Sequence, residues 1–147
     1  MHIALGSAFR WLTGAACVLL ATCATTSDPL VGTAWRLVAF ESMSDTIGII
    51  HPADATFTMR LGEDGTVTMR LDCNRATGSW SYEPVTGGSS GRFEFGRLAS
   101  TRALCSPPNL DERLLRDAEF VRGYVLRNGR LYLSLMADAG VYSWEPM

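Results

Sequence analysis

The most reactive side chains in this sequence are four cysteines, because a thiol can ligate a metal, attack a substrate or form a disulfide. Cys17 and Cys23 lie in an apolar N-terminal stretch, whereas Cys73 and Cys105 lie far apart in the rest of the chain. A zinc site needs three or four closely spaced ligands, and His51 is the only histidine after the N-terminal stretch. The spacing therefore predicts no metal site.

The N-terminal stretch has the pattern of an export signal. Arg10 precedes an apolar run over 11–20, which is shorter than the roughly 20 residues of a membrane-spanning helix. The run ends in "LATC", which resembles a bacterial lipobox with Cys23 as the lipidated first residue. We predict a lipoprotein-type signal peptide over 1–22, a polar tether over 23–30 and one domain over 31–147. Cleavage after Ala24 is the alternative, and it would release a soluble periplasmic or secreted protein.

Export favours one interpretation of the remaining cysteine pair. Disulfides form and persist in oxidising compartments, so Cys73 and Cys105 are predicted to be bonded to each other. In the chain-entropy model, a disulfide that closes a loop of this length stabilises the fold by about 3.7 kcal/mol. The alternative is two free buried thiols. A nucleophilic Cys73 would have to be free and exposed, which the predicted export argues against.

Other residues with possible catalytic chemistry lack the context that catalysis needs. Residues 87–91 spell G-x-S-x-G, but a hydrolase nucleophile requires a strand-to-helix turn, and this stretch lies between two predicted strands. His51 lies in a loop beside a proline, with Asp54 nearby and no nucleophile turn. Paired carboxylates stay open, because spacing along the chain does not give distance in space. We interpret the acids near one predicted hairpin as solvated turn residues: Glu63, Asp64 and Asp72. The sequence predicts no enzyme and no cofactor.

Charge excludes one class of partner. All 13 basic residues are arginine, and 15 acidic residues give the chain a net charge of −2. Nucleic-acid binding needs a basic stripe to neutralise phosphates, so we predict no nucleic-acid partner.

Alternating apolar and polar residues predict short strands along most of the mature chain. Over 56–61 and 66–72, apolar side chains recur at every second position, which is typical of strands with one face in water. Gly62–Gly65 is predicted to join these two strands as a hairpin loop. Asn128-Gly129 predicts a two-residue type I′ turn. Further strands are expected at 35–40, 78–84, 92–98, 124–127, 130–135 and 141–144.

One helix is expected within residues 106–123. Asn109 and Glu112 resemble a capping box, and the apolar positions mark one face: Leu110, Leu114, Ala118 and Val121. About eight strands and one helix predict a mainly β (α+β) fold. The expected architecture is a small antiparallel β-barrel, or a strongly curled sheet, with the helix packed on it as a plug or lid.

The ordered set of motifs resembles the META domain family, which includes HslJ-like heat-shock lipoproteins. The matching segments are "WRL" at 35–37, "CNRATGSWSY" at 73–82, "TRALC" at 101–105, "DERLLRDAEF" at 111–120, and the closing strands. The family residues are Trp35, Asn74, Gly78 and Thr101. The family often has glycine before its Cys-Asn, where this chain has Asp72. The resemblance implies a compact β-rich domain of the cell envelope, with ties to stress and antibiotic tolerance and no established enzyme chemistry.

These observations predict a non-enzymatic envelope lipoprotein that acts as a scaffold or binding module. It would be attached through the lipid on Cys23, face the periplasm from the outer membrane, and contact envelope proteins or a small hydrophobic ligand. Tyr142 and Trp144 are the aromatic residues expected to be exposed as a binding surface. The alternatives are a small ligand-binding barrel, and a periplasmic inhibitor that plugs a hydrolase with the loop at 87–91.

Overall fold

The computed structural model describes residues 28–44, 47–52, 56–107 and 110–147. The predicted signal peptide, Cys23, Asp54 and Asn109 lie outside the described residues. In the described part of the chain, no helix is both long and apolar enough to cross a membrane.

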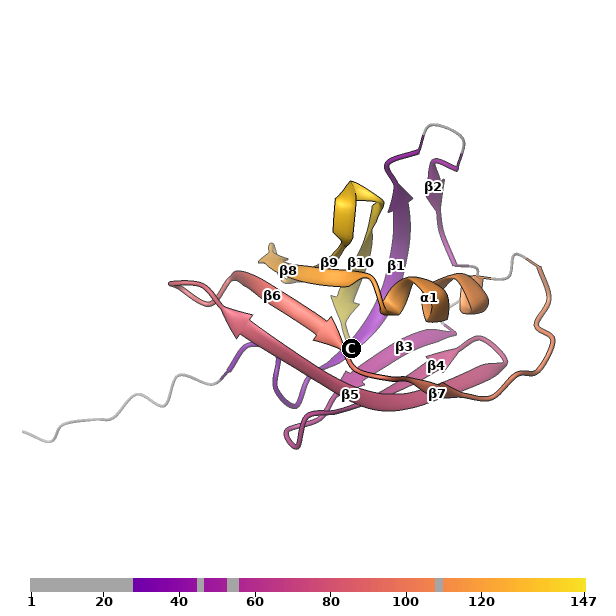
Figure 1. Cartoon of the computed structure of the whole chain (residues 1–147), viewed down its shortest axis with the longest axis horizontal. Coiled ribbons are helices and arrows are strands. Elements are labelled where there is room, and N and C mark those ends of the chain that lie inside the picture. The colour runs from indigo at the N-terminus through magenta and orange to yellow at the C-terminus, as the bar shows by residue number, and fades with distance from the viewer. Residues whose placement is uncertain (1–27, 45–46, 53–55, 108–109) are drawn as a thin grey trace, which may run out of the picture.

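The described residues form strands and one α-helix (Figure 1). The strands are β1 (Ala34–Ser42), β2 (Ile49–Ile50), β3 (Phe57–Leu61), β4 (Thr66–Leu71), β5 (Asn74–Pro84), β6 (Ser90–Phe95), β7 (Ala99–Ser100), β8 (Val121–Arg127), β9 (Arg130–Leu135) and β10 (Gly140–Pro146). The helix is α1 (Leu110–Ala118), and η1 (Met136–Asp138) is a short 3₁₀ turn.

Eight of these strands close into an antiparallel barrel. Neighbours follow the order β10-β9-β8-β6-β5-β4-β3-β1, and β1 pairs with β10 to complete the ring. Trp35 lies opposite Pro146 in this closing pair, and Arg36 forms an ion pair with Glu145 across it. β2 and β7 are two-residue additions that pair with β1 and β5. Of the two predicted architectures, the barrel is therefore the one that forms.

The hairpin turns follow from residues that tolerate a left-handed backbone. Asn128 and Gly129 have φ values of 53° and 73°, as a type I′ turn requires, and they join β8 to β9. Gly65 has a φ of 77° in the loop between β3 and β4. Both predicted hairpins are confirmed.

Side chains from the inward face of every barrel strand fill the interior. The alternation predicted for β3 and β4 is confirmed, because Met59 and Met69 are buried while Arg60 and Arg70 are exposed. The cavity between α1 and the interior, lined by residues such as Phe95, Leu133 and Trp144, measures only about 10 Å³. That volume is about the size of one water molecule, so it cannot hold the small hydrophobic ligand considered above.

The expected exposure of Tyr142 and Trp144 is wrong. Their side chains are only 2% and 1% exposed, and both belong to the hydrophobic core. β10 lies between β1 and β9, so the alternation along it directs these two rings inward. The sequence predicts a strand near the C-terminus but not its neighbours. Closure of the barrel pairs this strand on both sides and fixes which of its faces meets the core.

The helix is shorter than the sequence pattern predicts. α1 ends at Ala118, and Val121 begins β8, where it lies opposite Leu135. Leu110, Leu114 and Ala118 are buried, and the first two belong to the same core as the strands. Figure 1 shows α1 lying across the barrel between β1 and the chain that leaves β7. The helix thus covers the barrel interior, as expected for a lid.

Candidate binding groove

A buried amide connects three segments beside α1. Asn74 is 3% exposed and lies at the start of β5. Its Nδ2 donates to the Ala103 carbonyl and to Asp111 Oδ2, each at 2.9 Å. Its Oδ1 accepts from Thr101 Oγ1 at 2.9 Å and from the Ala103 N–H at 2.8 Å. Both ends of the amide are thus hydrogen-bonded, which compensates its burial.

A disulfide lies beside this amide. Cys73 and Cys105 are bonded, with Cα atoms 5.6 Å apart, and they are separated by 32 positions in the sequence. Thr101 Oγ1 also accepts from the Arg75 N–H at 3.0 Å. We call this group of Cys73, Asn74, Thr101, Cys105 and Asp111 the clasp. It ties the 101–105 segment and the first turn of α1 to the beginning of β5.

Three further positions of the family pattern have structural roles outside the clasp. Asp72, which stands where the family often has glycine, has a φ of 56°, a conformation that glycine adopts readily and that Asp tolerates. It lies in the two-residue connection between Leu71 and Asn74, which are opposite each other in the β4–β5 ladder. Gly78 lies where a Cβ would come within 2.5 Å of the Arg97 carbonyl oxygen, so the neighbouring chain needs glycine there. Trp35 is a core residue whose Nε1 donates to Thr33 Oγ1 at 2.7 Å.

The C-terminal half of α1 is attached differently. Tyr142 donates from its hydroxyl to Asp117 Oδ2 at 2.7 Å, and Arg113 Nε lies 3.5 Å from the same carboxylate oxygen. The Arg113 guanidinium lies 4.6 Å from the centre of the Phe40 ring. Burial and the hydrogen bond to Asp117 raise the pKa of Tyr142 well above its ordinary value. We call these four residues the aromatic anchor.

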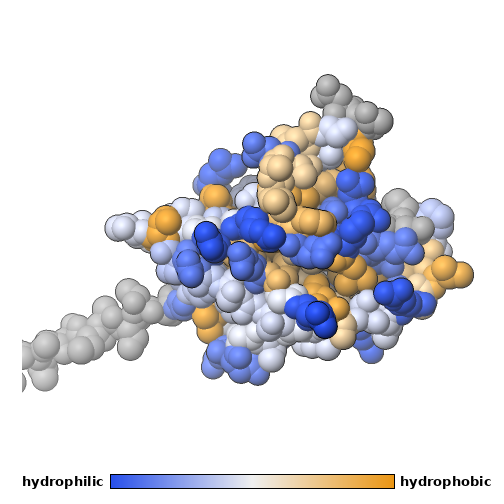
Figure 2. All heavy atoms as spheres, viewed as in Figure 1, coloured by the Kyte–Doolittle hydropathy of each residue, from blue (hydrophilic) through white to orange (hydrophobic). Residues whose placement is uncertain are grey.

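A groove lies between α1 and residues 96–104. Its volume is about 550 Å³, within the range of small-ligand sites. Asn74 and Asp111 of the clasp contribute to its lining, and its rims carry charged side chains from both sides: Arg97, Arg102, Glu112, Arg116 and Glu119. Figure 2 shows hydrophilic side chains over α1 and over the chain that follows β6, with hydrophobic side chains between them.

Among the described residues, those considered for catalysis are not brought together. His51 is exposed, and its Nδ1 lies 3.2 Å from the Val38 carbonyl oxygen. Residues 87–91 belong to the β5–β6 hairpin, where the chain passes from strand to strand without a helix. Asp64 is a turn residue whose pKa is lowered by hydrogen bonds from the Thr66 side chain and backbone. Within the described ranges, no group of three His, Cys, Asp or Glu side chains could hold a metal ion.

The fold and the clasp define a small, closed antiparallel barrel with a disulfide and one covering helix. The chain belongs to the META domain family, whose pattern matches residues 28–144. Among curated proteins, none matches this chain.

Two solved structures share the fold. An NMR structure of a protein from Burkholderia xenovorans has 20% sequence identity and a TM-score of 0.61, over 80% of this chain and 83% of the other. A crystal structure of a DUF4847-family protein from Bacteroides vulgatus has 12% identity and a TM-score of 0.55, over 79% of this chain and 93% of the other. At these identities the likeness concerns the fold alone.

Two functional features escape the sequence analysis. Asp111 is buried at 3% exposure, although its place in the first turn of an amphipathic helix predicts a solvated acid. The groove itself combines a loop and a helix face that no motif connects. The predicted bond between Cys73 and Cys105 is confirmed and already pointed to the clasp, as did the family residues Asn74 and Thr101 beside it.

Proposed function

We propose that this protein is a non-enzymatic component of the cell envelope that acts as a scaffold or binding module, linked through its family to stress and antibiotic tolerance. In this proposal, a lipid on Cys23 holds the domain on the outer membrane, facing the periplasm. The sequence "LATC" supports the anchor. The disulfide supports an oxidising compartment.

One observation carries the choice of a binding role at the surface. The cavity inside the barrel measures about 10 Å³, whereas the groove beside α1 measures about 550 Å³. A filled barrel cannot enclose a ligand as wider barrels do, so recognition would use the outside of the molecule. The groove is also bordered by Leu104, whose side chain is 98% exposed. The Leu104 side chain is therefore accessible to a partner that lies in the groove.

Site-specific photo-crosslinking in intact envelopes would test this role. A crosslinker at Arg97 or Arg116 should capture a discrete product, while the same group at Arg127, on the distant β8–β9 hairpin, should not. Cys23→Ser should abolish membrane attachment, and intact mass should report the lipid on the native chain. Equal products from all three positions would contradict the proposal.

The hydrolase inhibitor stays a second candidate because hydrogen bonds fix the β5–β6 hairpin near its tip. The Val85 N–H donates to the Ser90 carbonyl at 2.9 Å, and the Tyr124 hydroxyl donates to the Gly88 carbonyl at 3.0 Å. Figure 1 shows this tip projecting from the barrel. A scaffold tolerates Ser89→Ala, whereas an inhibitor using this tip would lose its partner.

A further inference from the structure

The edge of the sheet at residues 98–104 is paired on one side only. The Thr101 N–H donates to the Arg75 carbonyl at 3.0 Å, and the Ala103 N–H donates to Asn74 Oδ1. Backbone groups of successive residues in a strand point to opposite sides. The N–H and C=O groups of Ser100 and Arg102 therefore point away from β5. In the described part of the chain, β7 pairs with no strand other than β5.

The free side of this edge faces α1 across the groove. Ser100 and Arg102 line the groove from the edge, and Leu115 and Arg116 line it from the helix. β6 is paired with β8 only over Ser90–Arg92, so the pairing with β8 ends before the groove, whose lining begins at Gly96. An extended chain lying in the groove would pair with residues 98–104 on the side away from β5, in line with the position that β8 occupies beside β6. Its main chain would meet unpaired backbone donors and acceptors, and α1 would cover its other side.

The charges at the edge favour acidic side chains on such a chain. Arg97 and Arg102 are exposed, and residues 96–104 contain no acid. None of the ion pairs in the described residues involves Arg97, Arg102 or Arg116. Two exposed acids line the other side, Glu112 in α1 and Glu119 just after it, so the basic character belongs to the edge side. Opposite charges on neighbouring strands stabilise their pairing.

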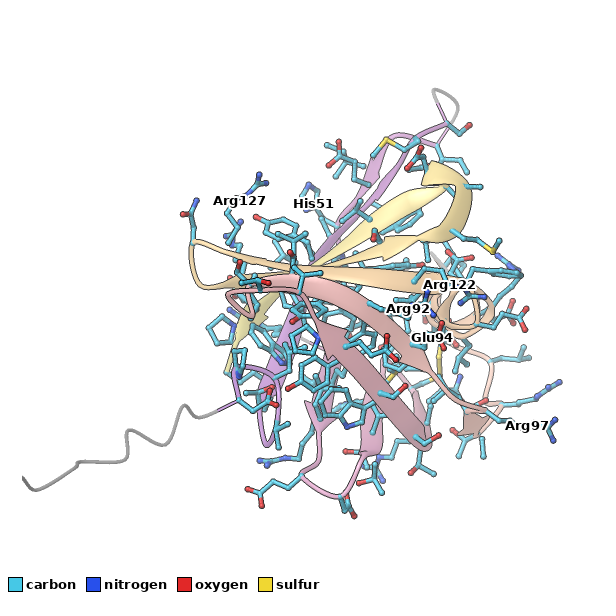
Figure 3. The ribbon with its side chains drawn as sticks, turned by 60° about the vertical axis from the view of Figure 1, so that its left-hand side comes forward. His51, Arg92, Glu94, Arg97, Arg122 and Arg127 are labelled. Carbon is cyan, nitrogen blue, oxygen red and sulfur yellow. A yellow bond between two sulfur atoms is a disulfide. The ribbon has the colours of Figure 1, made fainter. Side chains whose placement is uncertain are left out.

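The surroundings of the groove agree with this assignment. Figure 3 shows Arg92, Glu94 and Arg122 near one another on β6 and β8, and Arg97 projecting from the chain that follows β6. The Arg122 side chain donates to the carbonyls of Glu119 and Val121, at 2.8 and 2.7 Å. Arg122 is thus engaged with its own backbone, which leaves the recognition of acids to Arg97 and Arg102.

We propose that the groove binds an extended peptide segment of a partner protein as an added β-strand along residues 98–104. The segment carries acidic side chains that pair with Arg97 and Arg102, and apolar side chains that contact Leu98 and Leu115. This inference rests on the proposed binding function and names its partner. A second copy of this chain is the weaker occupant, because each copy's β7 edge is walled by its own α1.

The test uses a defined probe, the acetylated heptapeptide amide Glu-Val-Glu-Val-Glu-Val-Glu. Bound to the ¹⁵N-labelled protein, it should shift the amide signals of Ser100, Arg102 and α1, and protect the Ser100 and Arg102 amides from hydrogen exchange. A peptide with Lys in place of Glu should bind at least tenfold more weakly. A version N-methylated at alternate residues, which cannot donate main-chain hydrogen bonds, should lose binding.

Two variants separate main-chain pairing from other modes of binding. Ser100→Pro removes an N–H that points away from β5, and proline is tolerated at sheet edges, so the fold should survive while peptide affinity falls at least tenfold. Arg97→Glu combined with Arg102→Glu should reverse the preference toward the Lys peptide. Arg127→Glu, on the distant hairpin, should leave both affinities unchanged.

The outcomes distinguish this inference from the proposed function. Unchanged affinity in a folded Ser100→Pro protein, shifts confined to another surface, self-association through this edge, or no binding of the acidic probe would each overturn strand addition. If groove crosslinks to an envelope partner persist in Ser100→Pro, the binding module stands and only the strand-pairing mode fails. If crosslinks are also missing in the native chain, the proposed function fails with it.

Discussion

Two different sets of interactions attach α1 to the barrel, the clasp and the aromatic anchor. The clasp at its N-terminal end is polar and covalent, with a buried amide, a buried carboxylate and a disulfide. The aromatic anchor toward its C-terminal end combines Tyr142, Asp117, Arg113 and the Phe40 ring. Only the clasp contributes to the lining of the groove. Along its length, α1 also covers the core with Leu110 and Leu114 and lines the groove with Glu112, Leu115 and Arg116.

Removing the disulfide should be the strongest way to break the clasp. Cys73→Ser combined with Cys105→Ser releases a closed loop, and the chain-entropy model gives a loss of about 3.7 kcal/mol in the free energy of unfolding. Urea denaturation measures this loss, and reduction of the native protein should reproduce it. A loss below about 1 kcal/mol would show that the hydrogen bonds of the clasp hold the segment alone.

Removing the amide should have the next largest effect. Asn74→Ala leaves the Asp111 carboxylate and the Ala103 N–H without their buried partner, so we expect a loss of about 2–3 kcal/mol in unfolding free energy. Thr77→Ala, at an exposed position of the same strand, should change it by less than about 0.5 kcal/mol. Equal effects of the two substitutions would contradict a structural role for Asn74.

Loss of one hydroxyl should weaken the aromatic anchor. Tyr142→Phe removes a hydrogen bond to the Asp117 carboxylate and should cost about 1.5 kcal/mol at pH 7. The folded protein raises the pKa of Tyr142, so this stabilisation is fully present below the unfolded value of about 10 and is lost as pH rises above it. Urea denaturation from pH 7 to 11 should therefore show a shallower alkaline decline in Tyr142→Phe. A parallel decline in both proteins would exclude Tyr142 as its source.

Substitution at the groove rim should have the smallest effect on stability, in contrast to substitutions in the clasp and in the aromatic anchor. Arg116 is exposed and has no ion pair within the described residues, so Arg116→Ala should change the unfolding free energy by less than about 0.5 kcal/mol. Thermal denaturation measures this change. A loss of more than 1 kcal/mol would mean that the rim supports the fold and is not free for a partner.

Much of the fold was predictable because its signals are local. Side-chain alternation identified β3 and β4, and Asn128-Gly129 identified the β8–β9 turn. The helix boundary was not predictable in this way, because Val121 satisfies the helical pattern and also the ladder with Leu135. The helical spacing of apolar residues would extend the helix to Val121, but pairing with Leu135 across the sheet places this residue in a strand.

The candidate site was less predictable for the same reason. Asp111 has the sequence signature of a solvated acid in a first helical turn, but Asn74, 37 residues earlier, draws it into the clasp. Tyr142 and Trp144 share a strand face, and nothing local says whether that face meets water or the core. Burial of these side chains depends on which strands become neighbours.

The sequence by itself determined the short strands, their turns and the disulfide between Cys73 and Cys105. Strands and turns depend on local backbone preferences, and the disulfide follows from the number of cysteines left after the predicted export signal. The tertiary structure alone decided that β1 meets β10, that the interior is filled, and that α1 stands apart from residues 98–104 with an unpaired edge between them. The physical reason is that closure of a barrel is a property of all its strands together, and the surface it leaves unpaired is defined only once the ring is complete.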